Sequence, residues 1–296
     1  IGAGLDALNG AKVDGIIIGT ANGGMEDCIR FLNQIVDYDE GLLTPGNFVQ
    51  STPNAIAAQV SLITHNQSYN ITHMHRGLAF EMAMLDGLMK TREEPGKQFL
   101  VGAVDEISTY NHTIDLGAGW YKSEDCPNIE LLQSQTAGSI AGEGAAMFLI
   151  GDKKQNAVAE VLSIKTFSVV EQLSNSLRDL LSDNNCHLSE IDTLIVGRNG
   201  DCRFESTYSD FVSKFDPSLN VLSYKHMTGE FPTANALGFW LGVQFLSGMK
   251  IPQHMCLRPV QATQPKTLLI YNTYHGKQYS LILMRSTDNQ PYNKLQ

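Results

Sequence analysis

The sequence has few cysteines and contains no long apolar segment. Its five cysteines are widely scattered and form no C-x-x-C pair: Cys28, Cys126, Cys186, Cys202 and Cys256. An odd number at such spacings argues against a disulfide framework and against a structural zinc site, and it favours a reducing compartment such as the cytoplasm. No apolar run approaches the roughly 20 residues that a membrane-spanning helix needs, so we expect a soluble protein.

Positive charge is also scarce in this chain. Lys and Arg number 21 against 31 Asp and Glu, which gives a formal net charge of -10. An acidic chain without basic clusters is a poor candidate for binding nucleic acid or an anionic membrane surface. The 43% hydrophobic and 18% charged residues of this 296-residue chain are typical of a globular protein with a well-buried core.

Two parts of the chain share one pattern of apolar runs, each typical of a buried β-strand. The runs of the first set are residues 13–19, 99–102 and 144–150, and those of the second set are residues 191–197, 267–271 and 279–284. The sequence therefore predicts two similar α/β halves, 1–152 and 153–296, joined in the polar stretch 152–156.

Helical patterns rich in alanine or other apolar residues lie between these strands, at residues 55–62, 78–89 and 233–246. The segment 78–89 is apolar nearly all round, which indicates a helix buried on most sides. Duplicated α/β halves with buried helices predict a layered fold in which helices lie between two sheets.

Several stretches together carry a family resemblance. They are residues 19–24, 43–45 with Phe48 and Ser51, 72–77, 101–106, 142–146, and Lys225 ahead of Gly229. Their order resembles the β-ketoacyl-acyl carrier protein synthases of the thiolase superfamily over essentially the whole chain, nearest to a bacterial branch of aryl-polyene or flexirubin-type pigment synthesis. The resemblance implies a thiolase-like five-layer α-β-α-β-α fold from two duplicated halves. Family members begin with an additional strand and helix, which we expect to be missing before Ile1.

The family's nucleophile is a cysteine at the amino end of the central buried helix. There the helix dipole and the backbone N–H groups lower the thiol pKa and stabilise an oxyanion. The family pattern Cys-x-Ser-Gly, aligned on Gly77, places Met74 at the cysteine's position. A thioether cannot form a thiolate, so the resemblance implies that Met74 is non-functional as a nucleophile.

The two histidines of the family's decarboxylating chemistry are also replaced. The loop that should carry the first is residues 197–201, with Asn199 at its centre. Lys225 is kept, but Glu230 stands where the second histidine belongs. The family's Gly-Phe-Gly-Gly loop, which gates the acyl pocket, is replaced by a stretch containing Tyr274 and His275. Claisen condensation by the family's route is therefore not expected.

Three functions are open at this point. The first is a partner subunit similar to a chain-length factor, which pairs with itself or with an active ketosynthase, an acyl carrier protein being a further candidate partner. The second is an enzyme with altered acyl-transfer or acid–base chemistry, in which His73, His75, Arg76 and Glu81 cluster at the helix entrance and Glu230 faces the same cleft. The third is a non-catalytic binder of acyl chains or carrier protein, or a homodimer of another purpose.

Neither a cofactor nor a metal is expected. Residues 19–24 lack the G-x-G-x-x-G spacing of a dinucleotide site. His73 and His75 have no third certain ligand nearby, so we expect them to form hydrogen bonds across a dimer interface. Asp105 and Glu106 end a predicted strand and could be catalytic carboxylates, but the resemblance implies that both are structural and bonded to the backbone at a turn.

Glu230 is expected to be buried, and a buried carboxylate must pair with a cation or shift its pKa upward. We predict an ion pair with Lys225, His75 or Arg76 that fills the space where malonate would bind. Lys90, Arg92 and Lys97 could form a small basic patch for an acidic carrier protein.

Overall fold

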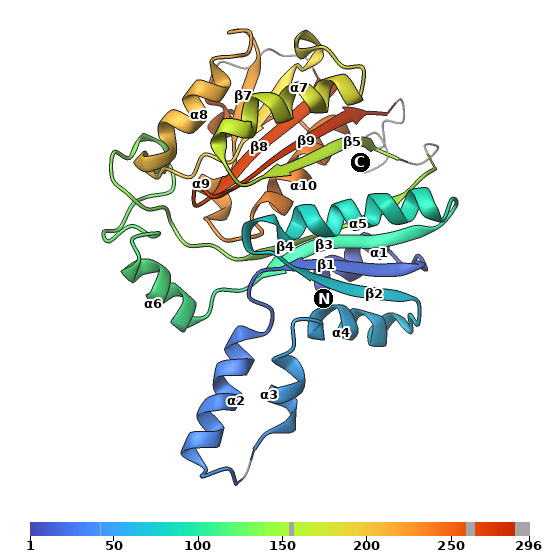
Figure 1. The fold of residues 1–296 in the computed structure, drawn as a ribbon, viewed down its shortest axis with the longest axis vertical. Coiled ribbons are helices and arrows are strands. Elements are labelled where there is room, and N and C mark those ends of the chain that lie inside the picture. The colour runs from blue at the N-terminus through green and yellow to red at the C-terminus, as the bar shows by residue number, and fades with distance from the viewer. Residues whose placement is uncertain (42, 154–156, 259–263, 288–296) are drawn as a thin grey trace. The chain divides into compact units, whose positions relative to one another are not determined.

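The computed structural model describes residues 1–41, 43–153, 157–258 and 264–287 (Figure 1). It divides into two compact units. The first unit holds Ile1–Gly117, Gly142–Asp152 and Phe231–Ala236, and the second holds Ala118–Ala141, Lys153–Glu230 and Leu237–Gln296. The division at residues 152 and 153 stays a prediction, and residues 154–156 of the expected polar linker lie outside the described residues.

The first unit contains a four-stranded sheet of order β2-β1-β3-β4. Its strands are β1 (Gly15–Thr20), β2 (Tyr69–Met74), β3 (Gln98–Asp105) and β4 (Gly144–Gly151). β1 is parallel to β2 and to β3, whereas β4 is antiparallel to β3.

Helices on both faces of this sheet explain why β1 is apolar throughout. Ile16 and Ile18 pack with α1 (Gly2–Leu8) and α4 (Ala55–Thr64). The alternate positions face α5 (Ala79–Glu93), because a Cβ on Gly19 would lie 2.3 Å from the carbonyl oxygen of Ala79. Figure 1 shows α5 on one side of this sheet and α4 on the other. The predicted burial of α5 is confirmed, since Phe80 and Met84 are inaccessible to solvent.

The second unit contains a five-stranded sheet of order β5-β9-β8-β6-β7. Its strands are β5 (Ala159–Phe167), β6 (Thr193–Val196), β7 (Asn220–Ser223), β8 (Thr267–Tyr274) and β9 (Gln278–Ser286). Its helices include α7 (Leu173–Asp183), α8 (Glu205–Val212), α9 (Lys225–Thr228) and most of α10 (Asn235–Leu246). The order β7-β6-β8-β9 repeats the order β2-β1-β3-β4, with the same parallel and antiparallel pairs.

The two units also share an aspartate in the same structural role. Asp14, just before β1, accepts a hydrogen bond from the backbone N–H of Gln98 at 3.0 Å. Asp192, just before β6, accepts one from the backbone N–H of Thr267 at 3.0 Å. In both units an aspartate joins the start of one parallel strand to the start of the next. All six predicted strands are present, and the predicted pairing of the two sets is confirmed.

Several elements were not predicted from the sequence. They are α2 (Met25–Asp37), α3 (Pro45–Gln50), α6 (Thr109–Gly117), β5, β7, α8 and the short 3-10 helices η1 (Arg76–Leu78), η2 (Leu131–Gln133), η4 (Val170–Gln172), η5 (Leu188–Glu190), η6 (Cys202–Phe204) and η7 (Gln253–Met255). α2 and α3 form a hairpin that extends away from the sheet of its own unit (Figure 1). No helix among the described residues combines the length and the hydropathy needed to cross a membrane.

Candidate functional site

A buried ion pair lies at the centre of the second unit. The Nζ atom of Lys225 donates hydrogen bonds to both Oε1 and Oε2 of Glu230, each at 2.9 Å. The Nδ2 atom of Asn199 donates a third to Oε2 of Glu230 at 2.6 Å. Lys225 and Glu230 are only 1% and 3% exposed. The ion pair predicted for Glu230 is therefore present, and its cation is Lys225.

The backbone holds Glu230 firmly in place. Gly229 has a φ of 74°, a left-handed conformation that a glycine adopts without steric cost. The N–H of Glu230 then donates to the carbonyl of Ile140 at 2.8 Å. Lys225 is the first residue of α9, and Tyr224 alone separates it from the end of β7. Both charged groups therefore lie on short segments fixed by backbone hydrogen bonds.

Asn199 lies in the loop after β6, and its conformation is also constrained. Its Oδ1 accepts from the N–H of Asp201 at 3.1 Å, and its carbonyl accepts from the Ser139 hydroxyl at 2.6 Å. With Oδ1 engaged in this way, the amide nitrogen points at Glu230. Gly197 leaves room for the pair, since a Cβ there would lie 2.1 Å from Oδ1 of Asn272 and 3.3 Å from Cε of Lys225.

Burial and hydrogen bonding shift the pKa of Glu230 in opposite directions. Burial raises the pKa of Glu230, and the charge and hydrogen bonds of Lys225 and the amide of Asn199 offset part of that rise. Taking two charges out of water costs several kcal/mol per ion, which only good geometry and extra hydrogen bonds can balance. Three hydrogen bonds to one carboxylate, two from Lys225 and one from Asn199, meet that requirement.

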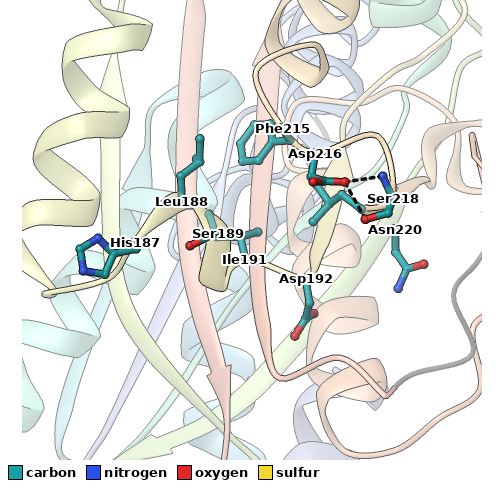
Figure 2. A pocket seen from close by; sticks show the side chains of 10 residues that line it. His187, Leu188, Ser189, Ile191, Asp192, Phe215, Asp216, Ser218 and Asn220 are labelled. Atoms are coloured by element: carbon teal, nitrogen blue, oxygen red, sulfur yellow. Dashed lines mark hydrogen bonds between the residues drawn. The ribbon is translucent and has the colours of Figure 1, made fainter.

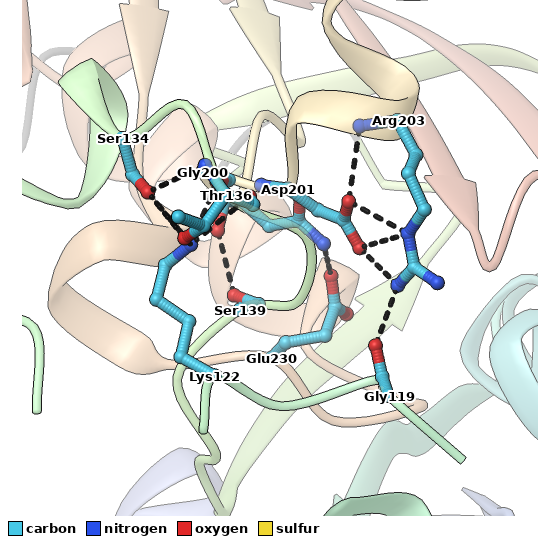
Figure 3. Close-up of polar contacts among 10 residues, drawn as sticks. Gly119, Lys122, Ser134, Thr136, Ser139, Gly200, Asp201, Arg203 and Glu230 are labelled. Carbon is cyan, nitrogen blue, oxygen red and sulfur yellow. Dashed lines mark hydrogen bonds and ion pairs between the residues drawn. The ribbon is translucent and has the colours of Figure 1, made fainter. Parts of the chain in front are cut away.

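The loop beyond Asn199 is held by a second polar cluster (Figure 3). The ammonium group of Lys122 donates to the hydroxyls of Ser134 and Thr136 at 2.8 and 3.0 Å and to the carbonyl of Gly200 at 3.2 Å. Asp201 is buried, and its carboxylate receives the guanidinium of Arg203 at both oxygens. These contacts, which the sequence did not single out, fix the loop that in the resemblance should carry the first histidine.

Tyr274 and His275 belong to a stack of flat side chains. The ring of His275 stacks on Tyr274 with centroids 3.9 Å apart and on Trp120 with centroids 3.7 Å apart. The guanidinium of Arg203 lies over the Trp120 ring at 4.7 Å. His275 itself has a φ of 53°, in the tight turn between β8 and β9. The stretch that replaces the family's Gly-Phe-Gly-Gly loop in the resemblance thus packs against aromatic side chains.

The remaining predicted residues lie in the first unit, at the start of the buried helix. Met74 ends β2 and is 49% exposed. His75 precedes η1, and Arg76 has a φ of 45°, a left-handed conformation that is strained for arginine. Nε2 of His73 lies 2.8 Å from Oδ2 of Asp86. A shared cleft of His73, His75 and Arg76 with Glu230 stays a prediction.

Two buried carboxylates of the first unit are structural. Asp105 accepts from the N–H groups of Ala21 and Asn22 and from the hydroxyls of Thr20 and Thr233, at 2.8–3.0 Å. Its predicted role at a backbone turn is confirmed. Burial nevertheless raises its pKa, despite the four hydrogen bonds. Glu81, on α5, accepts from the amide of Asn235 at 2.6 Å, a contact that its sequence position did not reveal.

A groove of about 670 Å³ lies at the beginnings of β6 and β7 (Figure 2). Its lining includes His187, Phe215 and Asp192. One oxygen of Asp192 binds the backbone at the start of β8, the role shared with Asp14. The groove therefore depends in part on residues that serve the sheet, and none of the predicted site residues lines it. Within the described ranges, no set of three His, Cys, Asp or Glu side chains is placed to hold a metal.

Comparisons with solved structures give the fold. A β-ketoacyl synthase from Burkholderia phymatum STM815 matches with a TM-score of 0.78 and 15% identity, over 97% of this chain and 81% of that chain. A chain of AntDE:AntF, a type II PKS acyl-carrier protein in complex with its ketosynthase bound to the hexaketide, matches with a TM-score of 0.74 and 15% identity over 95% and 80%. The ishigamide ketosynthase/chain length factor matches with a TM-score of 0.71 and 14% identity over 93% and 74%. The chain therefore has the thiolase-like α/β fold of the ketosynthases.

Comparisons at the level of sequence find nothing further. No protein-family model matches the chain, and no curated protein matches it.

Proposed function

We propose that this chain is a ketosynthase-fold subunit that lacks the condensing chemistry of the family and pairs with an active synthase, as a chain-length factor does. The observation that carries the proposal is the buried Lys225–Glu230 pair, to which the amide of Asn199 donates a third hydrogen bond. Asn199 and Glu230 stand at the two positions where the resemblance expects histidines.

The chemistry of the pair opposes condensation in two ways. A malonyl thioester carries a carboxylate, and Glu230 places a second anion where that substrate would be bound; like charges in a buried site repel strongly. Lys225 already donates to both oxygens of Glu230, so its ammonium group is engaged. At the end of β2, Met74 offers a thioether that cannot accept an acyl group.

The surface of the first unit supports pairing with another chain. On the α2–α3 hairpin, Val36 is 79% exposed, and Leu32, Phe48 and Val49 are each more than half exposed. No residue of α2 is buried. β2 lies at the edge of its sheet, which leaves a row of backbone groups open to a partner. An apolar hairpin and an open strand edge on one unit favour a dimer, either with a second copy or with a synthase.

Direct docking of a carrier protein is less well supported. Lys90 pairs with Glu93 at 3.0 Å and with Glu94 at 3.6 Å, and Lys97 also pairs with Glu94. The basic patch predicted from Lys90, Arg92 and Lys97 is therefore largely offset by carboxylates of its own segment. This favours a partner synthase that carries the docking surface for the carrier protein. All five cysteines are free, in keeping with cytoplasmic assembly of fatty acids or polyenes of the aryl-polyene type.

The test is the native mass of tagged protein recovered from its own cells, with identification of any co-purifying chain. A one-to-one complex with a synthase that carries cysteine and both histidines is the expected result. A homodimer alone, with no second chain at any protein concentration, would contradict the proposed role.

A second candidate is an enzyme with altered acyl-transfer chemistry. It rests on Arg76, which is exposed and strained at the start of a buried helix, because such backbone outliers cluster at functional sites. Intact mass after incubation with acyl thioesters distinguishes the two functions. A stable acyl adduct would favour the enzyme, and an unchanged mass would favour the partner subunit.

A further inference from the structure

Two short segments of the second unit bring two histidines and a methionine together. His226 and Met227 lie on α9, and His254 lies on η7. Nε2 of His254 is 3.0 Å from Sδ of Met227. The ring centroids of His226 and His254 are 6.3 Å apart, with the rings nearly perpendicular. None of the three side chains takes part in the Lys225–Glu230 pair.

His226 is the unusual member of this cluster. It is 6% exposed, and neither ring nitrogen forms a hydrogen bond of normal geometry within the described part of the chain, although the ring faces the backbone of His254. A buried polar group without a partner costs about 1–3 kcal/mol and calls for an explanation. Burial, together with the nearby His254, lowers the pKa of His226.

The geometry suits a shared metal ion. Two imidazoles bound to one metal at about 2.0 Å place their ring centroids roughly 5–6 Å apart, so a small rotation brings His226 and His254 into range. Met227 is 38% exposed and His254 is exposed, which gives an ion a path from solvent. Imidazole with thioether is a soft ligand set, and thioethers select Cu(I) among biological metals.

We propose that His226, Met227 and His254 bind one soft monovalent metal ion, Cu(I). The thiol of Cys256, two residues beyond His254, donates to the carbonyl of Pro252 at 3.3 Å and is not included among the ligands. Zn²⁺ is not expected, since it favours thiolate, imidazole and carboxylate ligands over a thioether. The metal would join η7 to α9, the helix that also carries Lys225, and this inference does not depend on the proposed function.

The experiment uses the full chain labelled with ¹³C at the methionine methyl groups, with Ag(I) as an air-stable probe for Cu(I). The five free cysteines also bind Ag(I), so the readout is the methyl resonance of Met227, assigned with Met227→Leu. This resonance should shift and then saturate at one ion per site. His254→Gln, a change at an exposed position, should abolish the shift. Met89, 57% exposed on α5, serves as a control whose resonance should not move.

Two outcomes would overturn the proposal. One is a Met227 resonance that stays fixed, or moves only together with Met89. The other is a shift that survives in His254→Gln, because the thioether would then be binding silver without the imidazole. A competition titration with a chromophoric Cu(I) chelator adds an independent measure. Loss of one ligand should weaken Cu(I) binding by about tenfold or more, which corresponds to about 1.4 kcal/mol.

Discussion

Replacing only one residue of the Lys225–Glu230 pair should lower the free energy of unfolding far more than replacing both. Removal of one partner of a buried ion pair leaves an uncompensated charge and typically costs about 3–5 kcal/mol, whereas replacement of both by apolar or neutral groups is often close to neutral. Both side chains are almost fully buried here and share two contacts of 2.9 Å. Lys225→Met and Glu230→Gln should each destabilise the protein by about 3 kcal/mol or more. The double variant should be at least about 2 kcal/mol more stable than the sum of the two losses predicts.

The assay is equilibrium unfolding in urea, run as a double-mutant cycle. A matched control is the pair Lys165–Asp183, with a shorter contact of 2.7 Å but side chains 34% and 56% exposed. Its coupling should be about 0–1 kcal/mol, the usual value for a surface pair. Additive effects of Lys225→Met and Glu230→Gln, within about 0.5 kcal/mol, would refute the claim that the buried pair acts as a unit.

The pH dependence of the single variant gives a second check on the same reasoning. Burial raises the pKa of Glu230, and Lys225 lowers it. Without the lysine, the folded-state pKa should rise further above its unfolded value. A carboxyl with a raised folded-state pKa favours folding when protonated, so Lys225→Met should be most stable at acidic pH. Its stability relative to wild type should fall as the pH rises through the folded-state pKa. A difference that does not change between pH 4.5 and 8 would contradict this sign.

Three further changes test the geometry elsewhere. Asp105→Ala should cost about 3 kcal/mol in urea unfolding, because the half-buried N–H groups of Ala21 and Asn22 lose their acceptor. Asp105→Asn should stay within about 1 kcal/mol in the same assay. Arg76→Gly should stabilise the protein by about 1 kcal/mol in the same assay, and Arg76→Ala should not, because only glycine relieves the left-handed φ of 45°. Gly197→Ala should cost about 1–3 kcal/mol and lower the thermal midpoint, because its Cβ would overlap Asn272; an unchanged midpoint would mean that the loop moves freely.

The scaffold could be predicted from the sequence because its residues obey local rules. The run at β1 is apolar on both faces, and such runs are found where helices cover a sheet on both sides. The alanine-rich and methionine-rich pattern of α5 likewise indicated burial before any contact was known. β7 was missed because only two of its four residues, Asn220–Ser223, are apolar. β5 was missed because polar residues interrupt its apolar run and its pairing shifts register between Val161 and Ser163.

The candidate site was predictable only in part. The position of Glu230 and its need for a cation followed from the family resemblance and the chemistry of buried carboxylates. The choice of Lys225 over His75 or Arg76 depends on tertiary packing, which no sequence spacing shows. The amide of Asn199 and the Trp120–His275 stack were likewise missed, since their contacts join residues 31 and 155 positions apart. The contact between Asp201 and Arg203 is local, because Asp201 caps η6 from the position before it, and this pattern in the sequence could have revealed it.

The duplicated scaffold explains why Lys225 lies close to position 230. Gly19 and Gly197 lie at the carboxyl ends of the matching strands β1 and β6, and a side chain at either would collide, with the backbone of Ala79 in the first unit and with Asn272 in the second. The close approach at Gly197 also brings Cε of Lys225 to within 3.3 Å of the space that a Cβ would occupy. The side chain of Lys225 thus packs closely against the loop after β6. A carboxylate at position 230 must then pair with the ammonium group of Lys225, as Glu230 does, and that group is engaged in the pair. A histidine at the same position would instead be kept neutral by the adjacent positive charge and free to donate a hydrogen bond.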